Sequence, residues 1–182
     1  LFRLRHHQHC KDADCFCESR YREYDDQCNK YTEVKERLEL ARLLVVAIEQ
    51  QQLELHYQPK IRFSDGKAVA VEALMRWPID GGFIPPVKFI PVAETSGLIF
   101  ELERFLVKRA CTDYLKLAEL GHSDINIAIN VSASVLETQA FFSYFKSTIK
   151  AHNVPAENLC IELTEGTVSR NQAILVNQLH KY

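Results

Sequence analysis

One short stretch decides the fold: Ala70-Val71-Glu72-Ala73-Leu74-Met75-Arg76-Trp77, an apolar run that holds one carboxylate and one guanidinium. If this run is a strand, alternation places Glu72 and Arg76 on the same face. Two opposite charges on a buried face are costly unless they pair with each other or meet a ligand. The stretch therefore predicts either an internal Glu72–Arg76 ion pair or a ligand site on that face.

A second alternating segment precedes this run. Residues 53–58 alternate apolar and polar side chains until Pro59, and the turn Ser64-Asp65-Gly66-Lys67 follows. Such a short connection predicts an antiparallel hairpin. Upstream, residues 33–52 carry apolar side chains at steps of three and four, which predicts an amphipathic helix. Residues 1–30 are polar and show no clear periodicity.

Helices and strands alternate along the rest of the chain. The patterns predict helices at 86–93, 99–120, 134–151 and 171–182, and strands at 125–132 and 159–164. This order indicates an α/β protein with a mainly parallel sheet covered by helices. Four strands with their helices are about half of an eight-stranded β/α barrel. We therefore expect a TIM-like β/α barrel with an antiparallel first strand, of which only the first half is present.

The composition excludes several classes of protein. The chain has 182 residues, of which 47% are apolar and 25% charged, and its net charge is −2. That charge gives no footprint for duplex nucleic acid or an anionic membrane. No apolar run approaches the roughly 20 residues of a membrane span, and no apolar segment near the start indicates a secretion signal. The first residue is not methionine, so we expect the chain to be cut from a longer protein.

Four of the six cysteines lie in the first 28 residues, near His6, His7 and His9. A zinc site there is one reading, but the spacing lacks the paired motifs of common zinc modules, which favours a solvated linker. No pattern requires disulfides, and a reducing cytoplasm is the default location. Residues 1–32 are expected to be a linker or the end of an upstream domain, and residues 33–182 a single domain.

Polar side chains recur near the carboxyl ends of three predicted strands, at Glu72, Asn130 and Glu162. In a β/α barrel the active site is built at that end. Carboxylate and amide oxygens suit Mg²⁺ or Mn²⁺, and Arg76 is suited to hold a phosphate. Structural roles stay open for each residue: Asn130 as a helix cap, Glu162 as a partner of Arg76, and Glu165 as a carboxylate in the first turn of a helix.

Five motifs now indicate a family. They are Tyr57-Gln58-Pro59, Glu72-Ala73-Leu74-Met75-Arg76-Trp77, Phe89-Ile90-Pro91-Val92-Ala93-Glu94, Asn130-Val131-Ser132-Ala133 and Glu162-Leu163-Thr164-Glu165. In order and spacing, residues 36–182 resemble the first half of the EAL-domain family. Members of that family are bacterial phosphodiesterases that linearise cyclic di-GMP, and their fold is a β/α barrel whose first strand is antiparallel to the second.

The resemblance implies a role for each matching residue. Glu72, Asn130 and Glu162 would be ligands of two Mg²⁺ or Mn²⁺ ions, which would lower the pKa of the attacking water. Gln58, Leu74 and Arg76 would contact the cyclic dinucleotide, with Arg76 on a phosphate. Glu165 would join Glu72 and Glu162 in the catalytic set by anchoring a mobile loop. Phe83 or Trp77 would pack near a base or belong to the core.

The later motifs of the family are not in this sequence. Its Asp-Asp-Phe-Gly-Thr-Gly segment and the lysine, glutamate and glutamine that follow are absent, and Gly166 stands where serine is usual. We therefore expect the complete domain to hydrolyse cyclic di-GMP to linear pGpG, and residues 1–182 alone to be inactive. Two alternatives stay open: a sensor that binds cyclic di-GMP without cutting it, and a protein-interaction domain.

The resemblance also bears on partners and location. Residues 21–40 are similar to the junction that follows a GGDEF domain, so fusion to an upstream GGDEF or sensor domain is open, as is a homodimer. The implied location is the bacterial cytoplasm, with or without a tether to the inner membrane.

Overall fold

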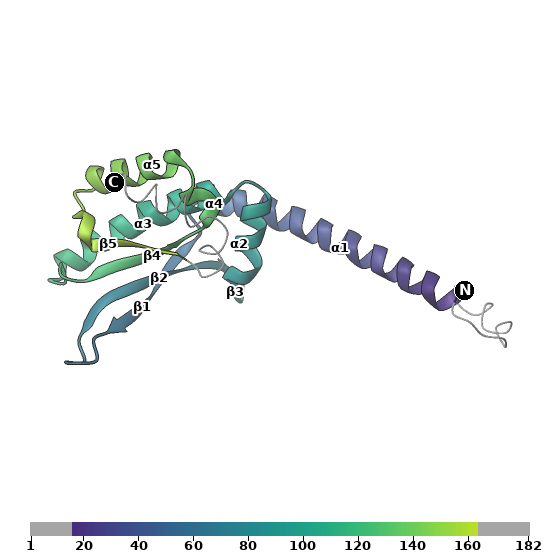
Figure 1. The fold of residues 1–182 in the computed structure, drawn as a ribbon, viewed down its shortest axis with the longest axis horizontal. Helices are drawn as coiled ribbons and strands as arrows, with labels where there is room; N and C mark the ends of the chain where they lie inside the picture. Colours follow the sequence, from purple (N-terminus) through teal and green to yellow (C-terminus); the bar gives the residue numbers. More distant parts are fainter. Residues whose placement is uncertain (1–15, 164–182) are drawn as a thin grey trace. The chain divides into compact units, whose positions relative to one another are not determined.

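The residues Gln58, Glu72, Arg76, Asn130 and Glu162 lie on a mixed β-sheet whose strands run in the order β1-β2-β4-β5 (Figure 1). The computed structural model describes residues 16–163. The strands are β1 (Glu54–Ile61), β2 (Ala68–Ile79), β4 (Asn126–Val131) and β5 (Leu159–Leu163). β2, β4 and β5 are parallel, and β1 is antiparallel to β2. This confirms the predicted hairpin and the parallel arrangement of β2, β4 and β5, within a sheet that is mixed as a whole.

A short strand lies between β2 and the next helix. β3 (Gly82–Ile84) pairs antiparallel with the end of β2. Asp80 and Gly81 form the two-residue connection, and Gly81 has φ +84°. Asp-Gly is a favoured sequence for such a tight hairpin turn, because glycine adopts positive φ without steric cost.

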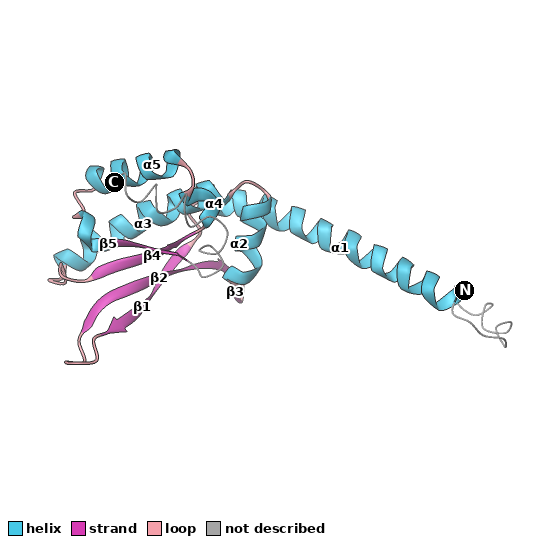
Figure 2. Ribbon diagram, viewed as in Figure 1, coloured by secondary structure: helices cyan, strands magenta, loops and turns pink. Residues whose placement is uncertain are grey.

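Helices cover one face of the sheet (Figure 2). They are α2 (Pro86–Thr95), α3 (Ile99–Glu119), α4 (Ala133–Leu136), α5 (Gln139–Ala151) and the 3-10 helix Ala156–Asn158. The core between the two layers contains the fully buried Phe89, Val107, Ile127, Ile129 and Phe141. The other face of the sheet carries the polar side chains that alternate with the buried apolar ones along the strands.

The predicted helix over residues 134–151 is in fact two helices. α4 ends at Leu136, and α5 begins at Gln139 after the cap residue Thr138. The Thr138 hydroxyl accepts a hydrogen bond from the Phe141 amide at 3.3 Å. A threonine that caps a helix favours a new start over continuation, and the apolar periodicity alone did not reveal this.

The predicted helix over residues 33–52 begins far earlier. α1 runs from Phe16 to Glu49. No glycine or proline occurs between these two residues, so a helix can form without a regular apolar face. The chain divides into two compact units, Leu1–Glu39 and Leu40–Tyr182. The assignment of residues 1–32 to a linker or upstream domain stays a prediction, as does the last helix at 171–182, which lies outside the described residues.

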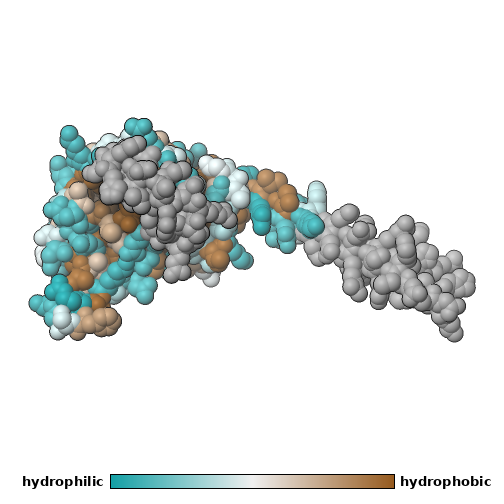
Figure 3. Space-filling view, viewed as in Figure 1, coloured by the Kyte–Doolittle hydropathy of each residue, from teal (hydrophilic) through white to brown (hydrophobic). Residues whose placement is uncertain are grey.

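Two further features concern the surface. Within residues 16–163, no helix is long and apolar enough to span a membrane. Ile61 and Phe63 are exposed at the tip of the β1–β2 hairpin, where Figure 3 shows hydrophobic atoms at the surface.

Among the described residues the sheet is not closed, so the structure gives an open mixed sheet with helices on one face.

Candidate active site

The side chains of β1 and β2 divide between two faces of the sheet. Ala73 and Met75 are buried under the helices, so Glu72, Leu74 and Arg76 lie on the opposite face. In the hairpin register Gln58 is paired with Glu72, which places Gln58 on the same face. We call this the carboxylate face. It holds the residues predicted for this site on β1 and β2.

Glu72 and Asn130 are in direct contact. The Nδ2 atom of Asn130 donates a hydrogen bond to Oε1 of Glu72 at 2.7 Å. β4 is parallel to β2, and Glu72 is paired with Ala128, so Asn130 lies on the same face two residues further along. An amide rotated by 180° would present its oxygen instead of its nitrogen. The contact therefore places one carboxylate and one amide side by side.

Glu162 lies next to this pair on the following strand. β5 pairs with β4 in parallel, and Glu162 is the register partner of Asn130. Its Oε1 atom accepts a hydrogen bond from Nζ of Lys60, and the two charged groups form an ion pair. Glu72, Asn130 and Glu162 thus lie on one face of three adjacent parallel strands.

The structure decides against a Glu–Arg ion pair in the described part of the chain. Arg76 donates from Nη1 to the carbonyl oxygen of Met75 at 2.9 Å. Neither Glu72 nor Glu162 forms an ion pair with it among residues 16–163. The two ion pairs that the sequence left open, Glu72–Arg76 and Glu162–Arg76, are therefore wrong predictions. Asn130 does not cap a helix either, since Ser132 is the residue before α4.

The other predicted residues differ in exposure. Gln58 is exposed and Leu74 is half-buried, both on the carboxylate face. Trp77 is buried and packs edge-on against Phe89, so it belongs to the core. Phe83 is half exposed and meets the ring of His56 at 5.5 Å between centroids. Glu165 and Gly166 lie outside the described residues.

Lys60 is a residue of this face that the sequence reasoning missed. Its hydrogen bond to Glu162 raises the pKa of its ammonium, a change that partial burial opposes. The available signal was its position, because alternation from Gln58 puts Lys60 on the same face.

Glu103 on α3 is a second missed residue. Only 3% of its surface is exposed, and burial raises the pKa of its carboxyl to about 7. Oε1 accepts a hydrogen bond from the amide of Ser132 at 2.7 Å, and Oε2 is buried without a hydrogen-bond partner among the described residues. Since Ser132 follows β4 two residues after Asn130, Glu103 holds the chain at the end of that strand.

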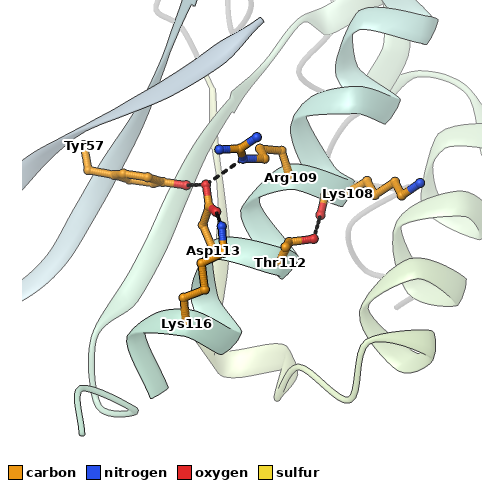
Figure 4. A network of polar contacts seen from close by, with 6 residues as sticks. All are labelled: Tyr57, Lys108, Arg109, Thr112, Asp113 and Lys116. Atoms are coloured by element: carbon orange, nitrogen blue, oxygen red, sulfur yellow. Dashed lines mark hydrogen bonds and ion pairs between the residues drawn. The ribbon is translucent and has the colours of Figure 1, made fainter. Parts of the chain in front are cut away.

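A polar cluster fastens β1 to α3 on the opposite face of the sheet (Figure 4). Asp113 is buried, and its Oδ2 atom accepts hydrogen bonds from the Tyr57 hydroxyl and from Nε of Arg109, both at 3.0 Å. Its Oδ1 atom accepts one from Lys116 at 3.0 Å. Burial alone would raise the pKa of Asp113, but these hydrogen bonds outweigh burial and lower it. The cluster fixes β1, and with it Gln58 and Lys60.

The donor set of the carboxylate face can be compared with what a metal needs. Among the described residues, no group of three or more His, Cys, Asp or Glu side chains is arranged for a metal ion. Two carboxylates and one amide nevertheless fit Mg²⁺ or Mn²⁺, since Mg²⁺ takes few protein oxygens and completes its shell with water and phosphate. The alternative zinc site of the N-terminal cysteines and histidines falls on side chains outside the described part.

The sequence matches a family model and several curated proteins. The sequence model described as EAL domain matches residues 41–182. The bifunctional diguanylate cyclase/cyclic di-GMP phosphodiesterase MucR of Pseudomonas aeruginosa is 36% identical over 138 residues, which cover 75% of this chain and 20% of that protein. The cyclic di-GMP phosphodiesterase PdeR of Escherichia coli is 34% identical over 137 residues, again 75% of this chain and 20% of the relative.

Solved structures give the same result. The structure described as PaMucR phosphodiesterase, c-di-GMP complex, matches with a TM-score of 0.73 and 33% identity, over 79% of this chain and 58% of that one. The Xanthomonas citri FimX EAL domain in complex with c-diGMP matches with a TM-score of 0.72 at 20% identity, over 82% of this chain and 58% of that one, which shows a shared fold. The chain thus spans only part of each relative.

Proposed function

The chain belongs to the EAL domain family, and on that premise we propose that it is part of a phosphodiesterase domain that hydrolyses cyclic di-GMP to linear pGpG. One observation carries the proposal: Glu72, Asn130 and Glu162 lie on one face of three adjacent parallel strands. Similarity to relatives named as cyclic di-GMP phosphodiesterases supports the substrate.

We further propose that the open sheet is the first half of a β/α barrel. The parallel order β2-β4-β5 and the antiparallel β1 support this. The carboxyl ends of the parallel strands would then form the mouth of the barrel, where β/α enzymes place their active sites. Later strands would supply the remaining ligands.

In this proposal the side chains divide the work. Glu72, Asn130 and Glu162 would hold two Mg²⁺ or Mn²⁺ ions, which when bound polarise the phosphodiester and lower the pKa of the attacking water. Arg76 would hold a phosphate oxygen by paired N–H donors. Gln58 and Leu74 would contact the rest of the dinucleotide. Glu165 would position a loop of the second half.

The proposal also covers context. MucR is named as both a diguanylate cyclase and a cyclic di-GMP phosphodiesterase, and this supports fusion of the present chain to a further signalling domain. We propose that this domain is an upstream GGDEF domain, as the resemblance of residues 21–40 implies. We also propose a bacterial cytoplasmic location and a homodimer.

The test is to incubate the full natural chain with cyclic di-GMP and Mg²⁺ or Mn²⁺ and to identify the products by chromatography. We expect cyclic di-GMP to be converted to pGpG, and chelation of the metal to stop the reaction. Glu72→Gln should lower the rate by more than about 100-fold, because loss of a ligand costs at least as much as loss of the groups that orient ligands. The matched control is Glu157→Gln, which removes an exposed carboxylate from the 3-10 helix.

Other results would favour the alternatives. Nucleotide binding without turnover would identify a sensor. Absence of both binding and turnover would leave the protein-interaction domain.

A further inference from the structure

We propose that Lys60 is an internal counter-cation of the carboxylate face, which holds Glu162 in the metal-free protein and is displaced when a divalent ion binds. The inference rests on the proposed function, because the ion in question is the one proposed for Glu72, Asn130 and Glu162. It assigns to Lys60 the control of metal affinity.

The position of Lys60 is the first argument. Lys60 comes from β1 and Glu162 from β5, the first and last strands in the order β1-β2-β4-β5. The ion pair therefore joins the two outer strands of the path, on the face that also carries Glu72 and Asn130 between them. A structural ion pair between neighbouring strands would not have to reach past this polar pair.

The charges are the second argument. Glu72 and Glu162 are two carboxylates on one face, and without a cation they repel each other. The ammonium of Lys60 supplies one positive charge, and its hydrogen bond goes to Oε1 of Glu162. A divalent ion bound by Glu162 needs carboxylate oxygens of the same residue. Lys60 and the ion therefore compete for one carboxylate.

Exposure is the third argument. The side chains of Lys60 and Glu162 are 39% and 32% exposed. Ion pairs with this much exposure are weak, because water screens the charges. The four-carbon stem of lysine is flexible, so its ammonium can withdraw into water without a change in the backbone. The pair is therefore strong enough to neutralise a carboxylate and weak enough to yield to a divalent ion.

The test compares Lys60→Met with wild type in the full natural chain, using Mn²⁺ alone in a calorimetric titration. Loss of the competitor should tighten Mn²⁺ binding, on the order of five-fold. In chelator, the same variant should unfold about 2–4 °C below wild type, because the carboxylates then lack a counter-charge. Added Mn²⁺ should stabilise the variant more than wild type.

Two further variants serve as controls. Lys60→Arg keeps the charge and should bind Mn²⁺ about as wild type does. Lys108→Met removes an exposed positive charge from α3, the helix that packs on the opposite face of the sheet, and should change neither measurement.

The outcomes separate this inference from the proposed function. If Lys60→Met binds Mn²⁺ equally or more weakly than wild type, Lys60 is a structural or phosphate-binding residue and the inference is wrong, while the metal site stands. If neither protein binds Mn²⁺, the proposed metal site is wrong, and the inference with it. A variant that binds Mn²⁺ where wild type does not would support the inference.

Discussion

Glu103 shows how a single buried carboxyl makes stability depend on pH. Burial raises its pKa from 4.5 to about 7, with Glu94 adding to the effect. The folded protein therefore keeps this proton between about pH 4.5 and 7, a range in which the unfolded chain has lost it. Because the native state binds more protons there, stability falls as the pH rises through that range.

Glu103→Gln should remove this dependence. The glutamine amide can still accept the hydrogen bond from Ser132 and carries no charge to be buried. We expect its advantage over wild type to grow from pH 5 to pH 8, on the order of 2–3 kcal/mol. Urea unfolding of both proteins across this range measures it. Parallel pH profiles for the two proteins would contradict the assignment.

Asp113 makes the opposite contribution. Its lowered pKa means that the ionised form is favoured in the folded state. The stability it adds is present above its usual pKa of 3.8 and is lost as the pH falls through the lower folded value. Three donors, Tyr57, Arg109 and Lys116, share this carboxylate.

Asp113→Asn should therefore destabilise the protein at neutral pH by about 2 kcal/mol, since hydrogen bonds to a charged group are the stronger kind. Tyr57→Phe should cost about 1 kcal/mol. Glu119→Gln, an exposed change on the same helix, is the matched control. Chemical denaturation gives the three values, and equal effects of Asp113→Asn and Glu119→Gln would show that the cluster adds nothing.

At the scale of elements, the start of α5 depends on one hydroxyl. Thr138 accepts from the Phe141 amide and donates to the carbonyl of Val135 at 2.7 Å. Thr138→Ala should lower the free energy of unfolding by about 1 kcal/mol, whereas Thr138→Ser should keep most of it. Urea titration of both variants tests the cap. If serine fails to restore what alanine loses, the hydroxyl is not the cause.

At the scale of the whole molecule, the sheet has an edge. Among the described residues β5 pairs only with β4, and the carboxylate face is not covered by helices. An unpaired edge invites association with further polypeptide. We expect residues 1–182, expressed alone, to associate in solution and to lack phosphodiesterase activity. Size analysis and thermal unfolding test this, and a monomer with one cooperative transition would show an independent domain.

Much of the arrangement followed from local patterns. Period-two alternation placed Glu72, Asn130 and Glu162 on faces of strands, and a short turn made β1 antiparallel to β2. These features depend on neighbours in the chain, which a sequence displays directly. The predicted helix boundaries were less accurate at Phe16 and Thr138. There helix propensity and a capping residue, rather than apolar periodicity, decide where the helix begins.

The sequence by itself determined the family, the order of the main strands and helices, and that Glu72, Asn130 and Glu162 share a polar face. It did not show β3, the break between α4 and α5, or the place of Lys60 on that face. Only the tertiary structure decided the partners: Glu162 with Lys60 instead of Arg76, Glu72 with Asn130, and Glu103 with the Ser132 amide. The physical reason is distance along the chain. A partner is chosen by which strands become neighbours and how far a side chain reaches, and these depend on the packing of segments that lie 29 to 102 residues apart.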